Sequence, residues 1–124
     1  MAAAQITVLV VDDHPRFRSA IERALRRAPG LQLLGSACSG EEGVPMIARL
    51  HPDVVVMDLA MAGMSGVEAT RRVMTQRRPP AVVALSGSRE LMRDAIAAGA
   101  GQALLKEADL TELLAAIRLV AARW

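Results

Sequence analysis

Three aspartates stand directly after two short apolar runs of the chain. Asp12 and Asp13 follow residues 6–11, and Asp58 follows residues 54–57. Carboxylates that lie close together repel one another, and a hard divalent cation such as Mg²⁺, which prefers oxygen ligands, relieves that repulsion. If the two runs are neighbouring strands of a sheet, we expect the three carboxylates to share one shallow pocket that binds Mg²⁺.

Two more polar residues, Ser86 and Lys106, stand at the ends of later strand-like runs. Lys106 is the only lysine among the 15 basic residues, since the others are all arginine. Beside a metal ion, a carboxylate can attack a phosphorus centre while the cation and a lysine neutralise the transferred oxygens. Asp58 is the predicted nucleophile because it stands alone at the tip of the central strand. The backbone carbonyl of Ala60, two residues later, is a predicted further metal ligand.

Such a site needs a scaffold of alternating strands and helices. Short apolar runs alternate with longer segments of helical period, which is typical of a parallel sheet covered by helices on both faces. We predict an α/β, doubly wound fold with strand order 2-1-3-4-5, whose ligands bind at the carboxyl ends of the strands. The predicted strands are residues 6–11, 31–37, 53–57, 81–85 and 103–105, and the predicted helices are residues 15–28, 41–50, 66–77, 89–98 and 109–122.

One local signal conflicts with this assignment. Ser39 and Glu42 have the spacing of a capping box at the start of the second helix. Pro45 would remove a backbone hydrogen bond if that helix already began at Gly40, so we expect the helix to start late or to be distorted.

Composition narrows the class of protein. A chain of 124 residues, 52% hydrophobic and 23% charged, is expected to form a single domain over residues 1–124. It has no apolar run long enough for a membrane helix and no signal sequence, which favours a cytoplasmic protein. Cys38 is the only cysteine and is predicted to be a core residue. The net charge of +2 is spread along the chain, and no residues remain for a helix-turn-helix after the last helix. Any DNA-binding output domain is therefore expected to lie outside this chain.

Four segments carry a resemblance to a known family. VLVVDDHP, VVVMDLAMAGMSGVEA, ALSG and AGAGQALLKEA resemble, in order and spacing across the whole chain, the corresponding segments of bacterial two-component response-regulator receiver domains, which have the CheY-like fold. The forms DDHP and LLKEA are most similar to the NarL/FixJ branch, whose members carry a LuxR-type helix-turn-helix output domain.

The resemblance implies a role for each residue of the predicted site. Asp13 and Asp58 would ligate Mg²⁺, Asp12 would bind it mainly through water, and Asp58 would accept phosphate from a sensor histidine kinase. Ser86 and Lys106 would contact the phosphoryl oxygens. The chain would then be a phosphoacceptor switch that assists its own phosphorylation and dephosphorylation, rather than an enzyme, and would control transcription. A homodimer and an external output domain are the further partners that the resemblance allows.

The sequence also departs from the family. Ala62 replaces a common proline, which predicts a looser loop after Asp58, and Ala103 replaces the usual Tyr or Phe, so the aromatic rotamer switch has no side chain. Lys106 is followed by Glu107 instead of proline. Ala62 and Ala103 favour an alternative, a degenerate receiver that acts as a phosphorylation-independent dimerisation or protein-interaction module, whereas the intact acidic set opposes it. Glu107 does not indicate inactivity, because the resembling branch often has an acidic residue there. A third alternative is a small flavodoxin-like hydrolase of phosphate esters.

Three residues near the site receive simpler interpretations. His14 is interpreted as a loop residue rather than a metal ligand, because no second His or Cys lies at ligand spacing. Gly63 and Gly66 are interpreted as turn residues, since the chain has no glycine-rich phosphate cradle.

Overall fold

Five parallel strands form one sheet in the computed structural model, which describes residues 5–123. The strands are β1 (Ile6–Val11), β2 (Leu31–Ala37), β3 (Val54–Asp58), β4 (Ala81–Ser86) and β5 (Gln102–Leu105), and their order across the sheet is β2-β1-β3-β4-β5. The predicted α/β fold and strand order are confirmed.

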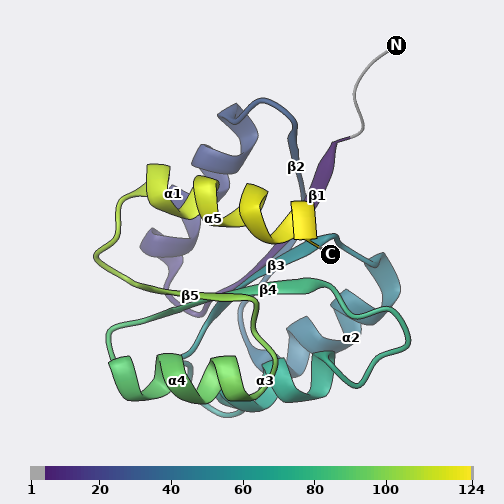
Figure 1. Ribbon diagram of the computed structural model, residues 1–124, viewed down its shortest axis with the longest axis vertical. Helices are drawn as coiled ribbons and strands as arrows, with labels where there is room; N and C mark the ends of the chain where they lie inside the picture. The colour runs from purple at the N-terminus through teal and green to yellow at the C-terminus, as the bar shows by residue number, and fades with distance from the viewer. Residues whose placement is uncertain (1–4, 124) are drawn as a thin grey trace.

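Five helices cover the two faces of this sheet. They are α1 (Pro15–Arg27), α2 (Gly40–Leu50), α3 (Gly66–Val73), α4 (Arg89–Ala97) and α5 (Leu110–Arg123). Figure 1 shows α1 and α5 on one face and α2, α3 and α4 on the other. The strands therefore lie in a middle layer, in which β1, β3 and β4 are largely buried and the outer strands β2 and β5 are partly exposed.

Two hydrophobic cores follow from this layering. Successive side chains of a strand point to opposite faces, so each buried strand contributes to both cores. The core under α1 and α5 includes Val8, Val10, Ile21, Leu25 and Ile117. The core under the other three helices includes Leu9, Val11, Ile47, Ala69 and Ala95. Because both faces are covered, β1 and β3 are almost continuously apolar until their ends, where polar residues can appear without entering a core.

The start of α2 differs from the prediction. The helix begins at Gly40 and runs through Pro45, so the expected late start is wrong. Two contacts fix the early start. The Ser39 hydroxyl accepts the Glu42 N–H at 3.1 Å, and Gly43 packs so closely on β1 that a Cβ there would lie 2.9 Å from a side chain of that strand. The cap and this packing offset the hydrogen bond that Pro45 cannot donate.

Two further expectations need correction. Helix α3 ends at Val73 rather than at residue 77, because the N–H groups of Thr75 and Gln76 bond to carbonyls only three residues back, which closes the helix with a tighter turn. Cys38 is exposed rather than in the core, since it lies in the turn between β2 and α2. Among residues 5–123, we find no helix that combines the length and the apolar character needed to cross a bilayer.

Candidate metal centre

The ends of two neighbouring strands bring the predicted aspartates together. Val11 of β1 lies opposite Met57 of β3, so the next residues, Asp12 and Asp58, stand level at the carboxyl edge of the sheet. Both residues are only 1% exposed, while the side chain of Asp13, one residue further on, is 28% exposed. The parallel register thus places two buried carboxylates and one partly exposed carboxylate at a single edge.

Lys106 reaches this edge from the last strand. Leu105 pairs with Ser86 of β4, and Lys106 follows directly after β5. Its Nζ lies 3.1 Å from Asp58 Oδ1 and 5.0 Å from the centre of the Phe17 ring, which lies on α1. The aromatic face attracts the ammonium group, so Phe17 helps to hold Lys106 over the carboxylates. No pattern in the sequence indicates this contact.

Each of the three carboxylates has one oxygen that accepts a hydrogen bond and one that accepts none from the described residues. The bonded oxygens accept backbone N–H groups: Asp12 Oδ1 from His14 at 2.8 Å, Asp58 Oδ1 from Ala60 at 3.1 Å, and Asp13 Oδ2 from Ala62 at 3.1 Å. The second oxygen of each aspartate is buried and accepts no hydrogen bond from the described residues. Burying such oxygens without partners is costly, and a divalent cation would remove that cost. The donor set, made of carboxylate oxygens, fits Mg²⁺.

The electrostatics of Asp12 agree with this description. Burial raises the pKa of the Asp12 carboxyl above its usual value, and the negative charge of Asp58 raises it further. The backbone N–H of His14 and the charge of Lys106 act in the opposite direction and do not cancel the rise. A cation placed between Asp12 and Asp58 would favour the ionised form of both carboxylates.

His14 belongs to this cluster, although it was interpreted as a loop residue. One potential ligand atom from each of Asp12, Asp13, His14 and Asp58 lies within 4.8 Å of the others. His14 occupies the N-cap position of α1, yet its side chain forms no capping hydrogen bond. The ring instead turns towards the carboxylates. The only signal for this in the sequence is its position between the aspartate pair and Pro15, which starts the helix.

Ser86 and Ala60 end or follow strands at the same edge, but the hydrogen bonds of the described residues do not join the Ser86 hydroxyl or the Ala60 carbonyl to the cluster. The Ser86 side chain is buried, and its Oγ accepts the N–H of Ser88 at 2.9 Å. Ala60 contributes its N–H, which donates to Asp58, whereas the prediction concerned its carbonyl. The roles assigned to the Ser86 hydroxyl and the Ala60 carbonyl therefore remain predictions.

The loop after Asp58 is attached at several points. Ala62 donates its N–H to Asp13, a bond that the family's proline could not form, and the N–H of Met64 donates to Glu41 Oε2 at 3.1 Å. At Gly66, a Cβ would lie 2.1 Å from the carbonyl oxygen of Asp58. Gly66 is therefore required by a close approach of two backbones rather than by a turn. Gly63, with φ of +74°, does serve turn geometry.

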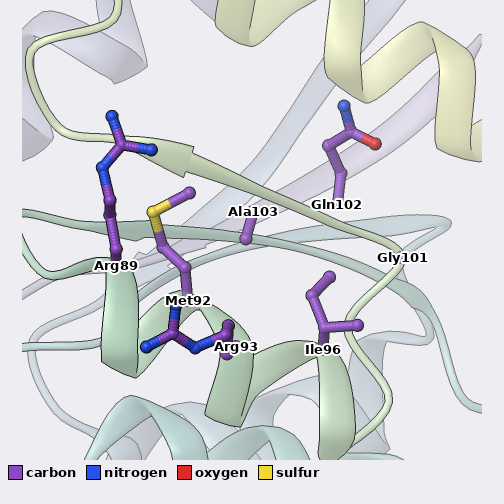
Figure 2. Close-up of a pocket in the computed structure, with 7 residues that line it drawn as sticks. All are labelled: Arg89, Met92, Arg93, Ile96, Gly101, Gln102 and Ala103. Atoms are coloured by element: carbon purple, nitrogen blue, oxygen red, sulfur yellow. The ribbon is translucent and has the colours of Figure 1, made fainter.

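A separate hollow lies between α4 and β5, and Figure 2 shows the side chains that line it. Met92 and Ile96 project from α4 towards the short side chain of Ala103 on β5. Ile96 is 49% exposed, and neither Arg89 nor Arg93 at the rim forms an ion pair within residues 5–123. This groove is apolar at its floor, basic at its rim, and distinct from the acidic cluster.

The comparison with protein families agrees with the fold and the acidic cluster. Residues 8–118 match the model of the response regulator receiver domain. The match covers most of the chain, so this protein belongs to the response-regulator receiver family, whose members bind Mg²⁺ at an acidic pocket.

Individual relatives point to one branch of that family. The chain is 44% identical to the response regulator GacA of Pseudomonas viridiflava over 117 residues, and 33% identical to the nitrate/nitrite response regulator protein NarL of Escherichia coli over 118 residues. These alignments cover 93% and 94% of this chain but 55% of each relative, so the chain spans about half the length of the curated relatives it matches.

Solved structures give the same result. The signal receiver domain of the response regulator NarL from Mycobacterium tuberculosis superimposes with a TM-score of 0.91 at 30% identity, covering 97% of this chain and 98% of that one. A two-component response regulator of the LuxR family from Aurantimonas gives a TM-score of 0.90, also at 30% identity, covering 97% and 87% of the two chains. The predicted resemblance to the NarL/LuxR-type branch is confirmed.

Proposed function

We propose that this chain is a phosphorylation switch that accepts a phosphoryl group on Asp58 from a sensor histidine kinase. One observation carries the proposal. Asp58 is buried at the end of the central strand, with Oδ1 held by Lys106 and the Ala60 N–H, while Oδ2 has no hydrogen bond. A carboxylate held on one oxygen and free on the other is oriented for attack.

The proposed metal ligands are carboxylate oxygens of the acidic cluster and one backbone carbonyl. Asp13 and Asp58 would bind Mg²⁺ directly, Asp12 mainly through water, and the Ala60 carbonyl would be a further ligand. Bound Mg²⁺ would neutralise the negative charge of the phosphoryl oxygens during transfer. Three carboxylate oxygens of the cluster support this assignment, because they are buried and accept no hydrogen bond from the described residues.

The remaining steps use the chain's own side chains. An Asp58 oxygen attacks the phosphorus atom, the new O–P bond forms, and the bond to the donor's histidine nitrogen breaks, so the imidazole leaves with the electron pair. Lys106, already 3.1 Å from Asp58, offers a positive charge to the phosphoryl oxygens. The Ser86 hydroxyl would exchange its bond with Ser88 for one to a phosphoryl oxygen. Hydrolysis of the same O–P bond by water would return the domain to its resting form.

Product recognition at Ser86 and Lys106 would shift the conformational populations of α4, β5 and α5. We propose that the whole of residues 1–124 is one receiver domain, in the cytoplasm, whose output is transcription through a DNA-binding domain outside this chain. The relatives named above, regulators about twice as long, support that output. A Lys106→Ala variant should still be labelled on Asp58, with a weaker conformational response.

The test is the intact mass of the protein after incubation with Mg²⁺ and acetyl phosphate. We expect a phosphoryl adduct that depends on Mg²⁺, appears in the wild type and is lost in Asp58→Asn. Asp53→Asn is the matched control, because Asp53 is an aspartate at the opposite edge of the sheet. An adduct retained in Asp58→Asn, or lost equally in the control, would contradict the assignment.

A second candidate function rests on the groove beside Ala103. Its apolar floor and its rim arginines, which form no ion pair within residues 5–123, favour a phosphorylation-independent interaction module that binds an acidic segment carrying one apolar side chain. In this case the wild type would neither form an adduct nor bind Mg²⁺. It would bind an acidic, aromatic-containing peptide, and Ile96→Asp would abolish that binding. A peptide affinity that rises when Asp58 is loaded with beryllofluoride would instead indicate the switch.

A further inference from the structure

The imidazole of His14 faces the same three carboxylates that form the proposed Mg²⁺ site. Its Nδ1 lies 3.0 Å from Asp13 Oδ1, 3.3 Å from Asp12 Oδ1 and 3.3 Å from Asp58 Oδ2. Two of these oxygens, on Asp13 and Asp58, accept no hydrogen bond in spite of the short distance. The same Nδ1 is within hydrogen-bonding distance of Asp12 Oδ1 and lies 3.3 Å from Lys106 Nζ, so a metal ion bound by the ring would replace these two contacts.

The spacing agrees with shared coordination. Adjacent ligands of an octahedral ion with metal–ligand bonds of 2.0–2.2 Å lie roughly 3 Å apart. The distances from His14 Nδ1 to the aspartate oxygens, 3.0 to 3.3 Å, match that separation. Asp58 Oδ2 and Asp12 Oδ2 accept no hydrogen bond from residues 5–123 and belong to residues only 1% exposed, so a cation would compensate their burial.

The backbone holds the ring in this place. His14 donates its N–H to Asp12 Oδ1 at 2.8 Å, and the next residue, Pro15, starts α1 with a fixed φ. The side chain is 55% exposed, so solvent and metal ions can reach it. A ligand atom with this support needs little movement to bind.

We propose that His14 Nδ1 is an additional direct ligand of the metal in this pocket, and that the site therefore favours later first-row transition ions such as Co²⁺ and Ni²⁺ over Mg²⁺. This inference rests on the proposed function, because it assumes that the acidic pocket binds a cation. Mg²⁺ prefers oxygen ligands, whereas imidazole nitrogen adds affinity for transition ions. The His14 contribution should therefore be large for Co²⁺ and small for Mg²⁺.

The experiment is a calorimetric titration of the metal-free protein with Co²⁺ and, separately, Mg²⁺. We expect His14→Asn to weaken Co²⁺ binding by about 10-fold or more while Mg²⁺ binding changes much less. His51→Asn is the matched control. His51 is the other histidine, is the C-cap residue that follows α2, and has φ of +50°, a conformation that Asn tolerates. Its two affinities should equal those of the wild type.

Pulsed electron paramagnetic resonance of bound Mn²⁺ gives an independent readout. Nitrogen coupling from the ring should be present in the wild type and in His51→Asn, and absent in His14→Asn. Equal changes in Co²⁺ and Mg²⁺ affinity, tighter binding of both ions by His14→Asn, or no nitrogen coupling in the wild type would overturn the role of His14. Failure of the wild type to bind either ion would instead overturn the proposed metal site as a whole.

Discussion

The two ends of the sheet hold aspartates in opposite circumstances. At the amino end, Asp53 Oδ2 accepts the Thr7 N–H at 2.8 Å and the Thr7 hydroxyl at 3.0 Å, and the Asp53 N–H donates back to that hydroxyl at 2.9 Å. At the carboxyl end, Asp12, Asp13 and Asp58 each have a buried oxygen that accepts no hydrogen bond within the described part of the chain. The same residue type therefore stabilises the fold at one end of the sheet, whereas at the other end it forms a site that a bound cation would stabilise. The number of hydrogen-bond donors around each aspartate, rather than the residue type, distinguishes the structural role from the proposed metal-binding role.

The largest change in stability should come from Gly66→Ala, at the ligand-binding end. The new Cβ would lie 2.1 Å from the Asp58 carbonyl oxygen, so the start of α3 or the end of β3 must move. We expect a loss of about 3 kcal/mol in the free energy of unfolding, measured by urea denaturation. A Gly35→Ala control, at a position where no atom lies within 4 Å of an added Cβ, should lose much less. Equal losses of unfolding free energy in the two variants would contradict the requirement for glycine at position 66.

The next effect should have the opposite sign. Asp12→Asn removes one of the repelling buried carboxylates, so the metal-free protein at pH 7 should gain about 2 kcal/mol in stability. The same variant should bind Mg²⁺ about 10- to 100-fold more weakly. If Asp12 stabilised the fold as Asp53 does, Asp12→Asn would lower the free energy of unfolding. That result would contradict the difference between the two ends of the sheet.

The gain from Asp12→Asn should depend on pH. Because the pKa of Asp12 is raised above 3.8, the folded wild type binds the Asp12 proton more tightly than the unfolded chain does. The Asp12 contribution to wild-type stability is thus fully present below pH 3.8 and is lost as pH rises through the folded pKa. The advantage of Asp12→Asn should therefore shrink on acidification, as measured by urea denaturation in a series of buffers. If the difference in unfolding free energy between Asp12→Asn and the wild type stayed constant across pH, the ionisation of Asp12 would not be its cause.

The smallest effect is expected at the amino end. Thr7→Val keeps the shape of the side chain but removes both hydrogen bonds of its hydroxyl with Asp53. We expect a loss of about 1 kcal/mol in the free energy of unfolding and an unchanged Mg²⁺ affinity. Any change in Mg²⁺ affinity in this variant would mean that the two ends of the sheet are energetically coupled.

The fold and the position of the acidic cluster could be predicted because both depend on local patterns. Apolar runs define the strands, and a parallel sheet with this order places the residues after β1 and β3 side by side. Asp12 and Asp58 follow from that rule alone.

The features that were missed depend on distances between segments. The orientation of His14, the close approach of Gly66 to β3 and the packing that lets α2 begin before Pro45 all require coordinates. A sequence pattern reports periodicity and composition, but it does not report which side chain occupies the space that a neighbouring element leaves.

The contact between Lys106 and Phe17 has a spectroscopic consequence. Phe17 is the only phenylalanine, and the chain contains no tyrosine. Biosynthetic incorporation of fluorophenylalanine would therefore place a single ¹⁹F nucleus on a ring whose centre lies 5.0 Å from the lysine ammonium group. The chemical shift of that single resonance would change when Lys106 moves relative to the ring. Phe17 is therefore a site at which one ¹⁹F label reports the position of the Lys106 ammonium group.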